Sequence, residues 1–475
     1  MTEIRTRFAP SPTGFMHVGN LRTGLFAWLT ARHSGGQFIL RIEDTDKNRE
    51  VEGSIDHILA CLNMLSLDRD EGIDIGGPYA PYLQSERLDI YRAWAQKLID
   101  AGRAYADPYT SEEVQAFREQ AQADKKPFLY RNHRPENPPV WDGNTPLRFK
   151  SEPKSYTWHD EVMGDLHAGE EVVDDFILIK SDGYPTYNFA HIVDDAEMKI
   201  THVIRGQEFI SSTPNYLNLY EALGVEKPVF ATMPHILNEQ GNKKLGKRDG
   251  ARDVLSYIDE GYLPETMLSF IATLGWNDGS EQEVFTRDEL IEKFSLDRVQ
   301  KSGARFDEKR LLWMNGQFIR ELSLEDLENR VRNFWPKSAE FADEQYKLQV
   351  LALAQDRLKT LADLPILTDY FFAEPTPDWT MIDDNKQLKK LDRSRQVELL
   401  QASLTALESS DFTPEALQAT LNTLLETTGE KPGTLFSLIR FAITWAPFSP
   451  ALPETMEVLG RDRVLERLQK ATESA

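Results

Sequence analysis

Cysteine is almost absent from this chain of 475 residues, which contains a single one, Cys61. One thiol excludes a disulfide within the chain, and it excludes a zinc site built on a Cys-x-Cys thiolate cluster. Cys61 lies in an apolar stretch, residues 58–65, whose spacing is typical of a buried helix face. We therefore expect Cys61 to be a core residue, and we expect no bound zinc.

Long hydrophobic runs are also lacking. No stretch of about eighteen apolar residues is present, as a membrane span would need. Charged residues enter the amino terminus by Glu3 and Arg5, which is not typical of a signal peptide. The content of 28% charged and 40% hydrophobic residues is that of a soluble globular protein. The sequence therefore predicts a cytoplasmic protein, which we expect to be a monomer of about two to four domains.

Positive charge is scarce, with 54 Lys and Arg residues against 77 Asp and Glu, for a net charge of −23. This balance excludes a protein that coats nucleic acid indiscriminately, because neutralising phosphates requires lysine and arginine. A local basic track on an acidic body can still hold one RNA. Histidine is confined as well, since all nine lie between His17 and His235. Histidine chemistry is therefore expected in the first half of the chain.

The stretch RFAPSPTGFMHVGN, residues 7–20, has the pattern of a nucleotide pocket. Two prolines stiffen its backbone, and Gly14 allows a turn that a residue with a Cβ would resist. His17, Gly19 and Asn20 directly precede a run with helical periodicity, so we expect them at a helix amino terminus with Asn20 as its cap. Such a terminus suits phosphates. Taken alone, so short a pattern favours chance, with His17 a satisfied surface histidine.

A second signature, KKLGKR, occupies residues 243–248 within a polar, glycine-bearing stretch. Adenylyl transfer is catalysed largely by positioning and by cations placed where negative charge develops. Lys244 and Lys247 on a mobile loop would supply such cations. The alternative is an ordinary solvated basic loop.

Together with RIEDTD at residues 41–46, these two signatures closely resemble the class I aminoacyl-tRNA synthetases, specifically the bacterial glutamyl-tRNA synthetase family. Beyond about residue 320, the resemblance depends on length and helical character alone. The other matching segments, in the family's order, are GPYAPYLQSER at 77–87, KSDGYPTY at 180–187, IVDD at 192–195, VIR at 203–205 and LWMNG at 312–316.

The resemblance implies an ATP-dependent ligase that joins L-glutamate to AMP and then passes the glutamyl group to the 3′ end of tRNA(Glu). Magnesium would arrive with ATP, and no serine or cysteine nucleophile is required. The residues implied to bind ATP are His17, Gly19, Asn20, Glu208, Lys244 and Lys247. Four of these, His17, Asn20, Lys244 and Lys247, are the expected catalytic groups.

The resemblance also implies a glutamate site. Arg7 and Tyr187 would recognise the side-chain carboxylate, Glu43 the α-amino group and Arg205 the α-carboxylate. The other implied contacts are Ala9, Ser11 and His191. His191 is equally well explained as a core histidine with a partner.

Three positions depart from the family's pattern. Asn20 replaces the final histidine of the general class signature, Gly246 replaces a serine of the lysine loop, and His191 stands where asparagine is expected. Some family members also bind zinc in an inserted domain, and this chain lacks the cysteines for that cluster.

The fold predicted for the amino-terminal part is a parallel, Rossmann-like α/β sheet. A strand at 4–8, a helix at 21–33 ended by two glycines and a strand at 37–42 indicate the first crossover. Ligands of such sheets bind beyond the carboxyl ends of strands, where Glu43 follows the second strand. Apolar strands at 176–179 and 200–204 are expected to return the chain to this sheet. Further helices are expected at 54–65, 85–101, 214–223, 252–260 and 265–275.

After about residue 320, apolar residues recur at spacings of three and four, which predicts an all-α region. The expected helical segments are 344–363, 395–408, 413–427, 432–445 and 461–471.

We expect five parts, whose functional names come from the resemblance. The inserted part is expected to be α+β, with a helix near 111–123 and strands near 147–149 and 161–166. The parts are the first half of the Rossmann-like catalytic domain at 1–105, an inserted tRNA acceptor-binding domain at 106–172, the second half at 173–235, a stem-contact region with the lysine loop at 236–320 and a helical anticodon-binding region at 321–475.

Three other functions remain open at this point. A small-molecule nucleotidylyltransferase of the same superfamily would share the nucleotide signatures, but it would not need the insertion or the long helical region. A glutamyl-queuosine-type tRNA modifier resembles the catalytic half and normally lacks the last helical domain. The third alternative is an RNA-binding protein with an inactive site.

Overall fold

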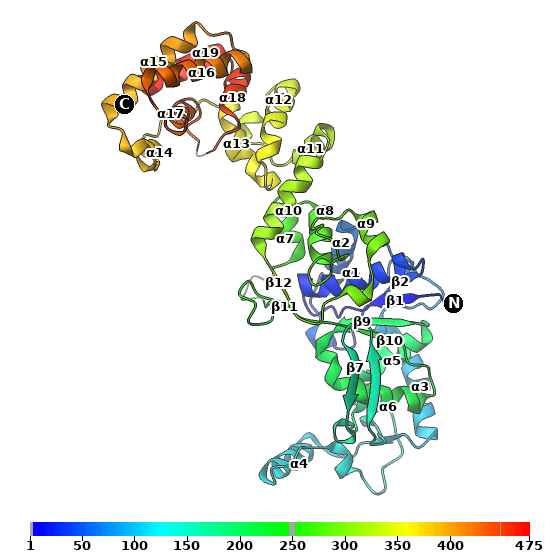
Figure 1. Ribbon diagram of the computed structural model, residues 1–475. Helices are drawn as coiled ribbons and strands as arrows, with labels where there is room; N and C mark the ends of the chain where they lie inside the picture. The colour runs from blue at the N-terminus through cyan, green and yellow to red at the C-terminus, as the bar shows by residue number, and fades with distance from the viewer. Residues whose placement is uncertain (1–2, 247–251, 447) are drawn as a thin grey trace. The chain divides into compact units, whose positions relative to one another are not determined.

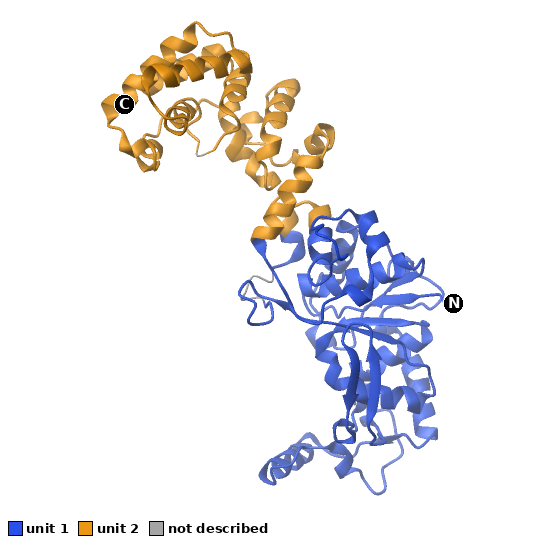
Figure 2. Ribbon diagram, in the orientation of Figure 1, with its two compact units in different colours: residues 1–256, 267–308 blue, residues 257–266, 309–475 orange. Residues whose placement is uncertain are grey.

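The computed structural model describes residues 3–246, 252–446 and 448–475 (Figure 1). The chain folds as two compact units, the first of residues 1–256 and 267–308, the second of residues 257–266 and 309–475 (Figure 2). Within the described ranges, no helix is both long and apolar enough to cross a membrane.

A seven-stranded sheet forms the centre of the first unit, in the order β3-β2-β1-β9-β10-β6-β7. All neighbouring strands in it are parallel except the hairpin of β6 and β7. This confirms the predicted Rossmann-like α/β class. The strands are β1 (Arg5–Phe8), β2 (Gln37–Leu40), β3 (Glu71–Gly72), β6 (Tyr156–Asp160), β7 (Gly164–Ala168), β9 (His202–Gly206) and β10 (Val229–Met233).

Helix α1 (Val18–His33) packs against β1 and β9 of this sheet. Its apolar residues at helical spacing, Leu21, Leu25 and Trp28 among them, are fully buried, as predicted. Gly24 allows the close contact, because a Cβ at this position would lie 3.1 Å from the ring of Phe8 on β1. The other helices up to residue 308 are α2 (Ser54–Met64), α3 (Leu88–Asp100), α4 (Ser111–Ala123), α5 (Tyr187–Glu197), α6 (Thr213–Leu223), α7 (Val254–Asp259), α8 (Pro264–Ala272) and α9 (Arg287–Lys293).

The predicted cap of α1 is wrong. The helix is capped by His17, whose backbone is extended (φ −113°, ψ 166°) and whose Nδ1 accepts a hydrogen bond from the N–H of Gly19 at 3.1 Å. Asn20 already lies in the first turn of the helix, so its side chain is not in the cap position. The helix therefore starts earlier than the apolar periodicity alone indicates.

A second sheet, antiparallel and three-stranded, contains β4 (Ala104–Ala106), β5 (Leu147–Phe149) and β8 (Ile177–Ile179). The expectation that residues 176–179 rejoin the large sheet is therefore wrong, because β8 pairs with β5 instead. The expected strand at 161–166 is also displaced. Residues 161–163 form the turn between β6 and β7, and this hairpin extends the large sheet.

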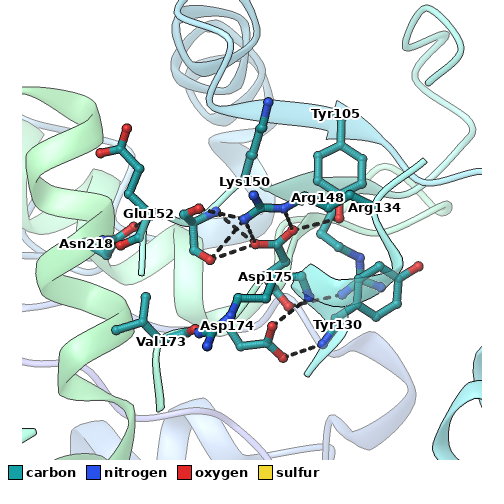
Figure 3. A network of polar contacts seen from close by, with 12 residues as sticks. Tyr105, Tyr130, Arg134, Arg148, Lys150, Glu152, Val173, Asp174, Asp175 and Asn218 are labelled. Atoms are coloured by element: carbon teal, nitrogen blue, oxygen red, sulfur yellow. Dashed lines mark hydrogen bonds and ion pairs between the residues drawn. The ribbon is translucent and has the colours of Figure 1, made fainter. Parts of the chain in front are cut away.

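Asp175 holds the second sheet to the loops around it (Figure 3). Its buried carboxylate accepts two hydrogen bonds from the guanidinium of Arg134, at 2.6 and 2.7 Å. It also accepts one from the hydroxyl of Tyr105 at 2.9 Å, and others from the N–H and hydroxyl of Ser151. One carboxylate therefore joins β4 to segments near residues 134 and 151.

The second unit is helical, which confirms the all-α prediction. Asn315 explains why residues 257–266 belong to it. The side-chain oxygen of Asn315 accepts bonds from Leu263 N–H and Thr266 hydroxyl, and its amide donates to the carbonyl of Lys359 at 2.6 Å. The helices from residue 308 onward are α10 (Glu308–Glu321), α11 (Leu324–Val331), α12 (Glu344–Ala354), α13 (Leu364–Phe372), α14 (Thr380–Asp384), α15 (Arg393–Glu408), α16 (Pro414–Thr428), α17 (Pro432–Thr444), α18 (Leu452–Leu459) and α19 (Arg461–Glu473).

Candidate active site

A cavity of about 510 Å³ opens at the carboxyl ends of β1, β9 and β10, beside the amino terminus of α1. In the sheet order, β1 has β2 on one side and β9 on the other, so the crossovers diverge at this point. Such a switch point is where ligands bind in open parallel sheets. The predicted site residues that line the cavity are Arg7, Ala9, Ser11, His17, Gly19, Asn20, Glu43, Tyr187, Arg205, Glu208 and Lys244.

Among the described residues, one predicted site residue is not in that lining. His191 lies just behind Tyr187 and is buried. Lys247 lies outside the residues that the structure describes. The lining also contains residues that the sequence prediction missed, among them Arg22 and His235. Arg22 stands three residues after Gly19, so helical spacing would have placed it on the same face of α1. No comparable signal marked His235.

The end of the cavity near α1 is rich in positive charge and N–H groups. The guanidinium of Arg22 is buried and donates to the carbonyl of Leu274 at 3.0 Å and to that of Pro234. The ammonium of Lys244 and the ring of His235 both lie 4.0 Å from the carboxylate of Glu208. Burial, and next the charge of Lys244, lowers the pKa of His235. A helix start beside a lysine and an arginine is suited to an anion such as a phosphate chain.

The opposite end contains buried arginines held by carboxylates. Arg7 donates from Nε to Asp195 at 3.1 Å and from Nη1 to the carbonyl of Ile204 at 3.3 Å. Arg41 donates to the same Asp195 oxygen at 2.9 Å. Burial alone would raise the pKa of Asp195, but the guanidinium groups of Arg7 and Arg41 lower it below its ordinary value. The Arg7 guanidinium is therefore fixed in place from behind.

Glu43 brings a carboxylate into the same end, directly after β2. It is 5% exposed and accepts a hydrogen bond from Nη2 of Arg41 at 2.9 Å. Burial raises the pKa of Glu43 to about 7, although Arg41 acts in the opposite direction. A carboxylate with a raised pKa in a cavity is typical of a functional group, and an incoming cation would stabilise its charged form.

Aromatic rings form one wall of the site. Tyr187, the first residue of α5, stacks on the ring of Phe209 at 5.2 Å and on the ring of His191 at 4.6 Å. Nδ1 of His191 donates to the carbonyl of Tyr187 at 2.7 Å. Burial lowers the pKa of His191 to about 3, so the ring is neutral at physiological pH. His191 is therefore buried behind Tyr187 and supports it through the ring contact and the hydrogen bond.

Arg205, on β9, is a further buried arginine in the cavity lining. Its guanidinium lies over the ring of Tyr216 at 5.1 Å, and Nη2 donates to the hydroxyl of Thr213 at 2.8 Å. Arg7 and Arg205 thus offer two cationic groups, and Glu43 offers one anionic group. A small molecule with two carboxylates and one ammonium matches this set of charges.

A possible metal site lies outside the cavity lining. Among the described residues, one group of three side chains could hold an ion, namely His57, Cys61 and Asp253, whose candidate ligand atoms lie within 4.8 Å of one another.

The chain is similar to known proteins along most of its length. Residues 3–313 match the family described as tRNA synthetases class I (E and Q), catalytic domain, and residues 326–472 match an anticodon binding domain. The chain is 42% identical to a glutamate–tRNA ligase of Dehalococcoides mccartyi, over 99% of this chain and 97% of that protein. It is 41% identical to one from Chloroflexus aurantiacus, over 98% and 97%.

Solved structures agree with the sequence matches. A glutamate tRNA ligase from Elizabethkingia meningosepticum, in complex with its amino acid, superposes with a TM-score of 0.87 at 34% identity, with 99% of each chain covered. The glutamate-tRNA synthetase of Elizabethkingia anophelis gives a TM-score of 0.85 at 33% identity, covering 99% of this chain and 100% of that one.

Proposed function

Because the chain belongs to the class I tRNA synthetases of the glutamate and glutamine type, with full-length relatives that are glutamate–tRNA ligases, we infer that it charges tRNA(Glu) with L-glutamate. The α-carboxylate of glutamate attacks the α-phosphorus of ATP, which forms glutamyl-AMP and releases pyrophosphate. A hydroxyl of the terminal ribose of the tRNA then attacks the glutamyl carbonyl, and AMP leaves.

The observation that supports this function best is the set of charges in the cavity. Arg7, Arg205 and Glu43 all line the cavity. The two arginines would bind the two carboxylates of glutamate, and Glu43 would bind its ammonium group. Tyr187 lines the same cavity and would contact the side-chain carboxylate, with His191 holding it from behind. Ala9 and Ser11 complete this end of the site.

ATP would occupy the end near α1. His17, Gly19 and Asn20 form the start of that helix, where N–H groups and the helix dipole favour phosphates. Lys244 and Lys247 would lie on the triphosphate and stabilise the charge that grows as pyrophosphate leaves. Glu208 lines this end, within ion-pair distance of Lys244.

We further propose that Mg²⁺ arrives with ATP, that no zinc is needed, and that the enzyme is a cytoplasmic monomer. Magnesium usually binds through phosphates and water. Light scattering of the purified chain tests the monomer, and elemental analysis of untagged protein tests for zinc.

The second unit argues against the two rival enzymes. A nucleotidylyltransferase of this superfamily needs no anticodon domain, and a glutamyl-queuosine-type modifier normally lacks one. Residues 326–472 match that domain, so tRNA charging is favoured over both. An RNA-binding protein with an inactive site would not explain the opposite charges that line the cavity.

The direct test is exchange of pyrophosphate with ATP in the presence of glutamate and tRNA, followed by charging of labelled tRNA(Glu). We expect both activities in the wild type. Lys244→Ala and Lys247→Ala should each lower the activation rate by about two orders of magnitude, as expected for the loss of one transition-state cation. Lys243→Ala, a neighbouring lysine outside the cavity lining, serves as the control. Absence of tRNA charging by the wild type would reject the function.

A further inference from the structure

A histidine on α2, His57, lies behind the segment that contains His17. We propose that His57 is a positioning residue for the activation step. It fixes the segment that contains His17 by bonding to Met16 within that segment and to Asp253, which pairs with it. This inference rests on the proposed function, in which His17 contacts ATP.

Both ring nitrogens of His57 are engaged. Nδ1 lies 3.3 Å from the backbone nitrogen of Met16, the residue directly before His17. Nε2 lies 2.6 Å from Oδ1 of Asp253. Because the backbone N–H can only donate, Nδ1 is the acceptor and the proton of a neutral ring is on Nε2, where it is donated to the carboxylate. The His57 side chain is 9% exposed and Met16 is buried, so the bond between them is shielded from water, whereas the Asp253 side chain is 34% exposed.

Asp253 also reaches the His17 segment through its backbone. His17 and Asp253 form an antiparallel bridge, and the N–H of Val254 donates to the carbonyl of Met16 at 3.2 Å. The ring of Phe15 stacks on His57 at 4.7 Å. Three separate segments therefore meet at His57, namely residues 15–17, α2 and residues 253–254. We call this arrangement the His57 clasp.

The clasp supports the wall of the ATP end of the cavity. His17 lines that cavity and caps α1, so its position depends on the path of the backbone through Met16. Removing the imidazole would leave the buried N–H of Met16 without this acceptor, and it would take from Oδ1 of Asp253 one of its two donors, the other being the N–H of Leu255. The unpaired N–H favours a shift of the backbone. Small displacements of groups around reacting atoms lower the rate strongly. The clasp is therefore expected to act on ATP and not on glutamate, which occupies the other end.

Metal binding explains these three side chains less well. Sγ of Cys61 lies 3.6 Å from Nδ1 of His57, but that nitrogen already accepts the bond from Met16. The group also offers three ligand atoms, one fewer than the four protein ligands of a structural zinc site. The hydrogen-bonded clasp satisfies the same groups without an ion.

The test compares two substitutions of His57 in the full-length enzyme. His57→Phe keeps the ring that stacks on Phe15 but removes both bonds. His57→Gln keeps an amide N–H near the position of Nε2, so the bond to Asp253 can form. We expect His57→Phe to lower kcat/KM for ATP about ten-fold or more, the loss typical of hydrogen bonds to a charged group. We expect His57→Gln to recover most of it, with the glutamate KM unchanged in both.

A double-mutant cycle with Asp253→Ala isolates the bond itself. If the clasp acts as one unit, the double variant should be no worse than the poorer single variant. His33→Phe, an exposed histidine at the end of α1, is the control and should behave as the wild type.

Several outcomes would overturn the inference. Wild-type kinetics for His57→Phe would show that the clasp does nothing for activation. Equal losses in His57→Phe and His57→Gln, with a higher glutamate KM and a lower melting temperature, would show a merely structural role. Zinc bound stoichiometrically by the wild type, and lost in Cys61→Ser, would show a metal site instead. Failure of the wild type to charge tRNA would reject the proposed function and leave the geometry of His57 untouched.

Discussion

At the scale of single residues, Arg7 is fixed before any substrate arrives. Asp195 holds its Nε and the carbonyl of Ile204 holds its Nη1. Within the described residues, no bond occupies Nη2, so this nitrogen is the one we assign to the side-chain carboxylate of glutamate. Glutamine has nearly the same shape but a neutral amide, so charge must separate the two substrates.

Arg7→Gln should therefore raise the glutamate KM strongly and abolish the preference over glutamine. Leaving one partner of a buried charged bond unpaired costs about 2–5 kcal/mol, or roughly thirty-fold to several thousand-fold in discrimination. Activation is measured with both amino acids at saturating ATP and tRNA, together with tRNA affinity. Arg32→Gln, which removes an arginine of α1 outside the cavity lining, is the control. An unchanged glutamate KM, or weaker tRNA binding with selectivity intact, would contradict the assignment.

We expect Glu43 to make glutamate binding depend on pH. Burial raises its pKa to about 7 in the free enzyme, so the carboxyl group is protonated in a growing fraction of molecules as the pH falls below that value. A protonated Glu43 cannot pair with the ammonium group of glutamate. We expect kcat/KM for glutamate to fall about ten-fold per pH unit below 7 and to level off above it, since this parameter reports the free enzyme.

The control for this profile is Glu43→Gln, which should give a low kcat/KM without the step near pH 7. The same profile is measured for ATP, where the step should be absent, because Glu43 belongs to the other end of the cavity. A wild-type glutamate profile that stays flat between pH 5.5 and 8 would show that Glu43 is ionised throughout, or that it does not bind the ammonium group.

At the scale of elements, Asp175 adds a buried polar anchor to the second sheet, whose strands β5 and β8 also contribute to a large apolar core. Asp175→Ala would leave Arg134 and Tyr105 without their common acceptor, and removing one partner of such a buried pair costs about 3–5 kcal/mol. The loss should be local, so hydrogen exchange should quicken in β4, β5 and β8 while β1 and β9 stay protected. Glu152→Ala, which removes an exposed carboxylate nearby, should change little. Uniform loss of protection across the first unit would contradict a local role.

The elements that the sequence predicted best are those with sustained periodicity. Helices α15, α16, α17 and α19 begin and end close to the predicted positions, because apolar residues repeat over several turns. The predicted strand at 176–179 exists, but the prediction that it joins the large sheet was wrong. A run of three or four apolar residues indicates a strand, yet it does not specify which strand is its neighbour. Strand β3, with two residues, is too short to leave any pattern.

The site was predicted through the family resemblance, and the structure explains what sequence alone could not supply. His57 and Asp253 are separated by 196 positions, so no spacing rule connects them. Arg41 lies inside the RIEDTD motif, but that motif does not reveal that Arg41 pairs with Asp195 in the folded chain. His191 was expected to contact glutamate, and in the structure its surroundings are those of a support for Tyr187.

At the scale of the whole molecule, chemistry and tRNA selection are assigned to different units. Every residue that lines the cavity belongs to the first unit, whereas the anticodon binding domain match, residues 326–472, falls in the second. The boundary is not a single point, because Asn315 of α10 bonds to Leu263 and Thr266. A cut directly after Gly316 would end the chain inside α10, so a cut after Glu321 preserves that helix.

Removal of residues 322–475 should therefore leave the glutamate and ATP pockets intact but impair the choice between tRNAs. We expect the truncated chain to exchange pyrophosphate when tRNA is supplied at high concentration, with substrate KM values for glutamate and ATP near those of the full chain. Its preference between purified tRNA(Glu) and tRNA(Gln) should differ from that of the full chain by about ten-fold or more, since a few lost base contacts, each worth roughly 1–3 kcal/mol, would suffice. Charging of both tRNAs by both chains measures this, with the melting temperature as a check on folding. Identical selectivity of a folded truncated chain would show that the first unit alone selects the tRNA.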